Sequence, residues 1–196
     1  VLAPGRGAAA QVVAFLQTGD SAGAEKAALR LTEQKPEDPQ GYRLLALVHE
    51  QAGSPDKALL ALDRAPAALR ENQELLMQRG GLLQKMKRND AARDAYEKAL
   101  RLKPGSPEAL FALGALHEGT GQTAKAEQYY RQVLAVSPNH VPTLNNLAYL
   151  AAESRADTRE AMRLAMNAYR QAPDNPYVLD TIGVIQVKER RYAEAV

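Results

Sequence analysis

The sequence predicts an all-α fold in which pairs of antiparallel helices stack into a solenoid, and three observations support this. Alanine recurs at a step of 34 residues, at Ala24, Ala58, Ala92 and Ala126. Alanine and leucine dominate the apolar residues, which favours helix. Glycine and proline recur in the same register and mark breaks between helices. A fixed period in this range is typical of repeat proteins, in which each repeat contacts only its neighbours.

The 34-residue step divides the chain into five complete repeats and one incomplete repeat. We expect a single array over residues 1–196, with repeats at 5–38, 39–72, 73–106, 107–140, 141–175 and 176–196. The fifth repeat has one extra residue in the polar segment ESRADTRE, where a turn tolerates an insertion. Because the chain begins at Val1 and stops at Val196 within a repeat, we interpret it as a segment of a longer protein.

The first three repeats each depart from the pattern. The leading segment of the first, GRGAAAQVVAFLQ, fits either an end repeat or a poorly ordered one. In the second, Pro66 comes four residues before the expected proline place, which Arg70 occupies. Proline inside a helix costs about 3 kcal/mol, so we predict that this helix ends or kinks near Ala65, and that Arg70 does not end it. The third has Arg79 where an apolar residue is expected.

The fourth repeat shows the pattern best, with a first helix expected over PEALFALGALHEG and a second over TAKAEQYYRQVLAV. Gly114 and Ala126 are small, which lets the two helix axes approach closely, and Tyr130 fills the space that they leave. Ala126→Leu should therefore overpack the core and cost about 1–3 kcal/mol. Glu118 lies on a neighbouring stripe, where we expect Glu118→Leu to cost little.

These residues resemble the signature of the tetratricopeptide repeat family over nearly the whole chain. In the fourth repeat the matching positions are Leu110, Leu113, Gly114, Ala126, Tyr130, Val133 and Pro138. The resemblance implies a right-handed superhelix in which the first helix of each pair lines a concave groove. It also implies a noncatalytic scaffold that binds a protein or peptide in that groove.

Three phrases near the C-terminus carry a narrower resemblance. NNLAYL, APDNP and VLDTIG are similar to the C-terminal repeats of bacterial envelope proteins tied to exopolysaccharide export and to PEP-CTERM/exosortase protein sorting. This resemblance implies a periplasmic or envelope-associated protein. The phrases also occur in other bacterial members of the family, so a cytoplasmic location is the alternative. The absence of cysteine fits both compartments.

Composition and histidine spacing argue against catalysis, and we expect no enzyme activity, metal or cofactor. The chain has no cysteine, a net charge of +2, and no apolar run near the roughly 20 residues of a membrane helix. His49 and His117 are each followed by glutamate, but glycine stands where a zinc-protease helix needs its second histidine. We expect both to pack in the core, and His140 to lie in a solvated loop.

The first helices carry a second stripe beside the core stripe, which we call the groove stripe. We expect a ligand to contact Arg43, Leu47, Met77, Gln84, Phe111, Glu118, Asn145, Tyr149 and Asp180, with Tyr177 on the same stripe. Met77, Phe111 and Tyr149 have no evident core role, which favours binding. The family's carboxylate-binding groove uses a Lys and Asn pair with further basic residues, and this stripe lacks that set.

Two other partners are open. The third repeat has a charge balance of +4, and its basic stretch from Lys85 to Lys103 favours an anionic polymer as the alternative ligand. It has no interleaved aromatics to stack bases, so nucleic acid is not expected. In the incomplete sixth repeat, Leu179, Ile182 and Ile185 would lack a full partner helix. We expect those side chains to be covered by self-association or by an apolar chain in the adjacent groove.

Overall fold

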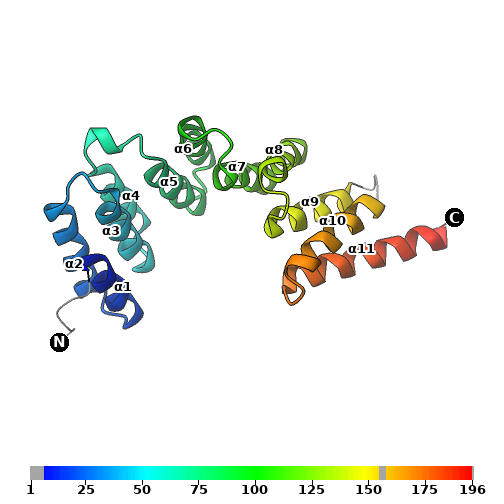
Figure 1. Ribbon diagram of the computed structural model, residues 1–196, viewed down its shortest axis with the longest axis horizontal. Coiled ribbons are helices and arrows are strands. Elements are labelled where there is room, and N and C mark those ends of the chain that lie inside the picture. The colour runs from blue at the N-terminus through cyan, green and yellow to red at the C-terminus, as the bar shows by residue number, and fades with distance from the viewer. Residues whose placement is uncertain (1–6, 155–157, 196) are drawn as a thin grey trace. The chain divides into compact units, whose positions relative to one another are not determined.

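The computed structural model describes residues 7–154 and 158–195, with side chains up to Arg190 (Figure 1). All regular secondary structure in this part of the chain is helical, as the sequence predicts. The chain divides into two compact parts, the N-lobe (Val1–Pro104) and the C-lobe (Gly105–Val196).

The N-lobe consists of three helix pairs. They are α1 (Ala8–Gln17) with α2 (Ser21–Gln34), α3 (Pro39–Gln51) with α4 (Pro55–Asp63), and α5 (Gln73–Lys85) with α6 (Asn89–Leu102). Short polar side chains set where helices begin: Asp38 accepts a hydrogen bond from the Gln40 amide at 2.9 Å, and Asn72 accepts one from the Glu74 amide at 2.9 Å.

The C-lobe consists of two helix pairs and a single long helix. They are α7 (Pro107–Gly119) with α8 (Thr123–Val136), α9 (Val141–Glu153) with α10 (Thr158–Gln171), and α11 (Pro176–Ala195). Pro107 and Pro176 are the first residues of their helices, where proline removes no intrahelical hydrogen bond. Helices α3, α5, α7, α9 and α11 all begin at the first residue of a predicted repeat.

The turns within the first four helix pairs each use a left-handed backbone position. Gly53 and Gly121 have φ values of 68° and 75° there, which glycine adopts without steric cost. In the third repeat the same place is held by Lys87 with φ 59°. A lysine in this conformation brings its Cβ too close to the following carbonyl, so this turn is strained relative to the others.

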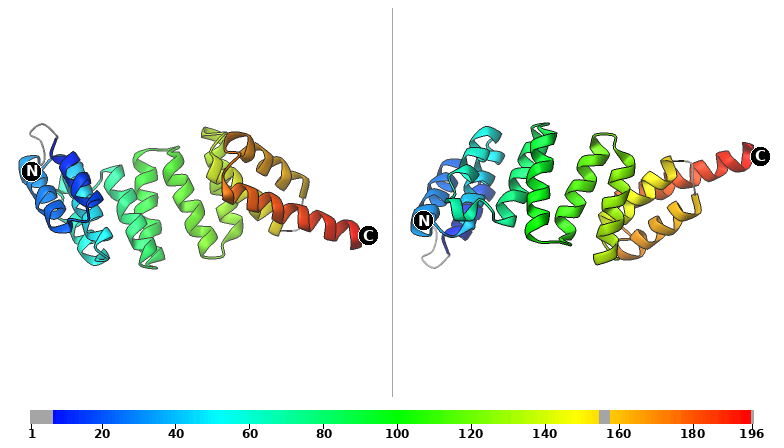
Figure 2. Two further views of the ribbon diagram at one scale, coloured as in Figure 1. Left: turned by 90° about the horizontal axis from the view of Figure 1, so that it is seen from below. Right: turned by 90° about the horizontal axis from the view of Figure 1, so that it is seen from above.

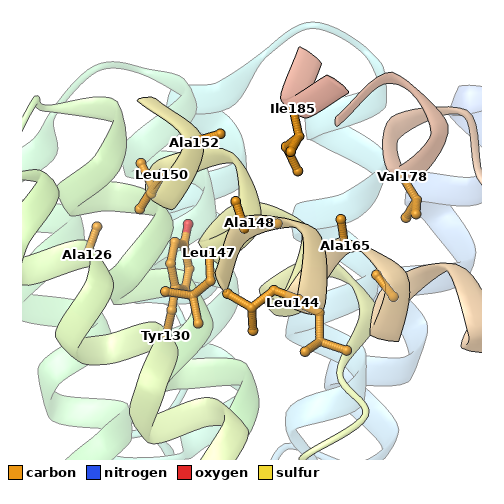
Figure 3. Packing of buried hydrophobic residues seen from close by; sticks show 13 residues of the cluster. Ala126, Tyr130, Leu144, Leu147, Ala148, Leu150, Ala152, Ala165, Val178 and Ile185 are labelled. Carbon is orange, nitrogen blue, oxygen red and sulfur yellow. The ribbon is translucent and has the colours of Figure 1, made fainter. Parts of the chain in front are cut away.

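The predicted packing of tyrosine against glycine is confirmed in both lobes. A Cβ added at Gly114 would lie 2.5 Å from Cε1 of Tyr130, and one added at Gly80 would lie 2.4 Å from Cε1 of Tyr96. Tyr130 and Ala126 are fully buried in the C-lobe core, which continues through Leu144 to Val178 and Ile185 on α11 (Figure 3).

The prediction for Pro66 is also confirmed. Helix α4 ends at Asp63, and Pro66 precedes a short 3-10 helix, η1 (Ala67–Leu69). Arg70 follows η1 and plays no part in ending α4. At nine residues, α4 is more than one turn shorter than α2 and α6, which have fourteen residues each.

The sixth repeat differs from the prediction in two ways. Helix α11 runs without a break to Ala195 and extends past the ends of α9 and α10 (Figure 2). Arg190, a good helix former, stands at the turn place that Gly53 and Gly121 hold in the second and fourth repeats. Ile185, expected to lack a partner, is fully buried with Val178 in the C-lobe core, whereas Leu179 is 48% exposed and Ile182 is half-buried.

Candidate functional site: the groove stripe

In the N-lobe, Arg43 of the groove stripe and the charged residues near it on α3 and α5 form ion pairs. Arg43 forms an ion pair with Glu74 of the next repeat, and Gln78 donates to the Arg43 carbonyl at 3.0 Å. Glu50 pairs with Lys85 in the same way. These pairs join α3 to α5, so the N-lobe stripe offers a ligand little uncompensated charge.

The uncharged N-lobe candidates are only partly accessible. Leu47 and Met77 are half-buried. Gln84 accepts a hydrogen bond from the Tyr96 hydroxyl at 3.0 Å, which ties α5 to α6. Burial raises the pKa of Tyr96 to about 12, so this hydroxyl stays a donor at neutral pH. The first duty of Gln84 is therefore structural.

In the C-lobe, Glu118 belongs to a hydrogen-bond network that joins three helices. Its carboxylate accepts from the Tyr130 hydroxyl at 2.5 Å, and Asn146 donates to the same hydroxyl at 2.9 Å and to Glu118 at 3.4 Å. Burial, followed by the bond to Glu118, raises the pKa of Tyr130 above its ordinary value. The expectation that Glu118→Leu costs little is therefore wrong, because leucine would leave the buried hydroxyl without its acceptor.

Phe111 packs in the core, contrary to the sequence prediction that it has no core role. Its ring lies 5.7 Å from the ring of Tyr130 and 5.2 Å from that of His140, and it packs against the C-lobe core. The expectation of a solvated His140 is also wrong: it is half-buried at the start of α9, with Nδ1 2.8 Å from the Thr143 hydroxyl. Burial lowers its pKa, although nearby Glu108 acts in the opposite direction.

The exposed members of the stripe lie on α9 and α11. Tyr149 is 41% exposed, Tyr177 is 75% exposed, and Asp180 is exposed without an ion pair among the described residues. The sequence prediction missed Val187, which is 50% exposed at the same place in its repeat as Glu118. The repeat register could have indicated Val187, whereas only the tertiary structure shows the part that Asn146 plays.

Asn145 adds an unsatisfied polar atom to this region. Its amide oxygen is buried and has no hydrogen-bond partner within residues 7–154 and 158–190. Buried polar atoms are nearly always paired in native proteins. Asn145 lies one helical turn before Tyr149, so the orphaned acceptor lies close to an exposed aromatic ring.

The other two histidines pack as the sequence predicts. His117 is 5% exposed and stacks on Tyr129, with ring centroids 5.4 Å apart. His49 is largely buried near Glu25, at 3.8 Å. In the described part of the chain there is no group of three or more His, Asp or Glu side chains that could hold a metal ion. None of the described helices is long and apolar enough to cross a bilayer.

Half of the cations of the third repeat are engaged in ion pairs. Arg79 pairs with Asp63 and Lys85 with Glu50. Arg88 contacts Asp56 at 3.2 Å, and Arg93 contacts Asp90 at 3.0 Å. These contacts reduce the uncompensated charge that an anionic polymer would meet.

Comparison with known proteins identifies the repeats. Two family models described as tetratricopeptide repeat match residues 9–72 and 73–139. Three curated relatives align with most of the chain: Protein O-mannosyl-transferase TMTC1 of Mus musculus, TPR repeat-containing protein PA4667 of Pseudomonas aeruginosa, and cellulose synthase operon protein C of Pseudomonas fluorescens. Their identities are 30%, 27% and 27%, over 73%, 74% and 71% of this chain. The chain spans 15%, 25% and 10% of their respective lengths.

Solved structures show the same fold. Pseudomonas aeruginosa pilF matches with a TM-score of 0.78 and 22% identity, over 96% of this chain and 86% of that one. YrrB, described as a TPR protein with an unusual peptide-binding site, matches with a TM-score of 0.64 and 19% identity, over 86% of this chain and 87% of that one.

Proposed function

Because this chain belongs to the tetratricopeptide repeat family, we propose that it is a noncatalytic scaffold that binds a peptide or protein segment along the groove stripe of the C-lobe. The observation that carries the proposal is that Tyr149 and Tyr177 are both exposed on this stripe, with the orphaned amide oxygen of Asn145 one helical turn from Tyr149. Tyrosine provides a large contact area at low entropic cost.

Charge indicates which peptides the C-lobe stripe favours. Asp180 is exposed and has no ion pair among the described residues, and Glu118 lies on the same stripe. Lys188, which follows Val187 on α11, is already paired with Glu153. A ligand with a basic side chain next to an apolar one would meet Asp180 and the tyrosine faces together, and aromatic faces attract cations.

Peptides selected on this chain from a displayed library of short random sequences provide the probe. Tyr149→Ala and Tyr177→Ala should each lower the affinity for a selected peptide with basic and apolar residues by about tenfold, as expected for aromatic side chains that the ligand buries. Met166→Ala is the matched control, because Met166 has the same 41% exposure as Tyr149 but lies on α10, away from the stripe. Equal losses in the control and in the tyrosine variants would reject the stripe as the binding site.

We also propose that the parent protein serves in assembly or export of bacterial envelope components and is periplasmic or envelope-associated. The segment NNLAYL and the likeness to cellulose synthase operon protein C support this setting. Alkaline phosphatase fused to the full-length protein in its own host becomes active only if the fusion is exported. If the alkaline phosphatase fusion stays inactive while a fusion to a reporter that works only in the cytoplasm is active, this part of the proposal is wrong.

A second copy of the chain is the alternative occupant of the same face, because Val187 adds to its exposed apolar surface. Sedimentation velocity distinguishes the two cases. A monomer that binds the selected peptide supports a peptide ligand, whereas a dimer lost in Tyr177→Ala assigns the face to self-association. If the ligand is an anionic polymer, which is the remaining alternative, its binding should weaken steeply with added salt.

A further inference from the structure

The N-lobe contains a cleft of about 440 Å³ that lies outside the groove stripe. Its floor is formed by the edges of Leu62, Leu75 and Leu76, and its rim carries Arg70, Arg79 and Lys98. The lining comes from α4, the segment after η1, α5 and α6. The stripe residues of α5, such as Met77, do not line it.

The cleft is next to the point where α4 stops short. Pro66 lacks an amide hydrogen and clashes with a preceding helical turn, so α4 ends at Asp63. Helices α2 and α6 each continue for more than another turn, and α2 packs against the following first helix, α3. Without that turn, the side of α5 that carries Leu75 and Arg79 borders an open cleft.

The same interruption accounts for an arginine at a core position. Arg79 corresponds to Leu113 of the fourth repeat, which is fully buried. At the cleft, the guanidinium reaches Asp63 at the end of α4, and the Arg79 side chain remains 38% exposed. An arginine can occupy this place because its charged end lies at the rim while its stem packs against the leucines.

The rim carries more positive than negative charge. Arg70 and Lys98 form no ion pair among the described residues, and Arg79 shares its partner Asp63 with no other cation. Glu71 is the remaining acid on the rim, which leaves the three cations in excess. Guanidinium and ammonium groups around an apolar floor suit carboxylates carried on an aliphatic stem.

We propose that this cleft is a second binding site, which holds an acidic segment of a partner protein through Arg70, Arg79 and Lys98. A nucleic acid fits less well, because no aromatic side chain lines the cleft to stack a base. A free inorganic anion would leave the leucine floor uncovered. The site does not depend on the groove stripe, so each can fail without the other.

The test uses the displayed random peptides on the intact chain, with counter-selection on the double variant Arg70→Gln/Lys98→Gln. The matched control is Arg101→Gln/Lys103→Gln, which removes the same charge from exposed positions outside the cleft. Circular dichroism verifies that both variants fold. Peptides retained by the original chain and by the control should contain aspartate or glutamate next to leucine or a similar residue.

A synthetic peptide of that selected sequence should bind the cleft variant about 5- to 30-fold more weakly than the original chain, and the control less than about twofold more weakly. Equal weakening in both variants would mean attraction by the basic surface as a whole and would overturn the proposal. So would a failure to recover discriminating peptides, or recovery of peptides without acidic residues. If single-stranded RNA displaces the peptide, and RNA binding is lost in the Arg70→Gln/Lys98→Gln variant, the cleft is a nucleic-acid site instead.

Discussion

Gly114→Ala tests the close approach of α7 and α8 more sharply than any other single change. The added Cβ would lie 2.5 Å from Cε1 of Tyr130 and 2.7 Å from Cδ1, whereas carbon atoms prefer separations of about 3.5–4.0 Å. The ring must therefore move by about 1 Å. Tyr130 is fully buried, and its hydroxyl is held by Glu118 and Asn146, so movement would also distort those hydrogen bonds.

The magnitude follows from two opposing terms. Overpacking a well-filled core costs about 1–3 kcal/mol, while replacing glycine by alanine within a helix gains about 0.5–1 kcal/mol. Gly119→Ala, at the end of the same helix, is the matched control, because a Cβ there meets nothing within 4 Å. The propensity gain largely cancels between the two variants, so their unfolding free energies should differ by about 1–3 kcal/mol.

Urea unfolding followed by circular dichroism measures this difference, provided that the two variants share one denaturant slope. Tyr130→Leu in the Gly114→Ala background removes the clashing ring, so the two substitutions should cost less together than the sum of their separate costs. If Gly114→Ala is as stable as Gly119→Ala, the glycine is not there to admit the ring, and the explanation of the tyrosine–glycine packing is wrong.

Three further predictions concern the α7–α8 and α5–α6 pairs. Ala126→Leu should lower the unfolding free energy by about 1–3 kcal/mol, and Glu118→Leu should lower it by a similar amount because Tyr130 loses its acceptor. Glu118→Gln should cost less than Glu118→Leu. Urea midpoints that rank these variants otherwise would contradict the hydrogen-bond network. The pKa of Tyr96 is raised from 10.0 to about 12, so its contribution to stability is complete below pH 10 and falls as the pH rises toward 12. The melting temperatures of the original chain and of Tyr96→Phe should therefore converge between pH 10 and pH 12. Parallel melting curves over that range would refute this contribution of the Tyr96 hydroxyl. Lys87→Gly should raise the unfolding free energy by about 1 kcal/mol by relieving a left-handed lysine, and a lower urea midpoint would show that the turn is not strained.

The sequence alone determined most of the fold, because each repeat contains residues that mark where its own helices begin and end. Proline and asparagine mark helix starts, glycine marks the turns, and Pro66 predicts the end of α4. These effects act within a few residues of the chain, so they can be read without knowing what packs where. The pairing of Gly114 with Tyr130 was also predictable, since the period brings the same two positions together in every repeat.

Only the tertiary structure decided which groove-stripe residues are accessible. Arg43 and Glu118 look equally exposed on a helical wheel, yet one is paired with Glu74 of the next repeat and the other accepts the Tyr130 hydroxyl. Phe111 has no core role by spacing, but its ring lies against His140 at the start of the next repeat. Such contacts join residues from 12 to 31 positions apart, and they depend on side-chain reach between packed helices, which a period in one chain does not record.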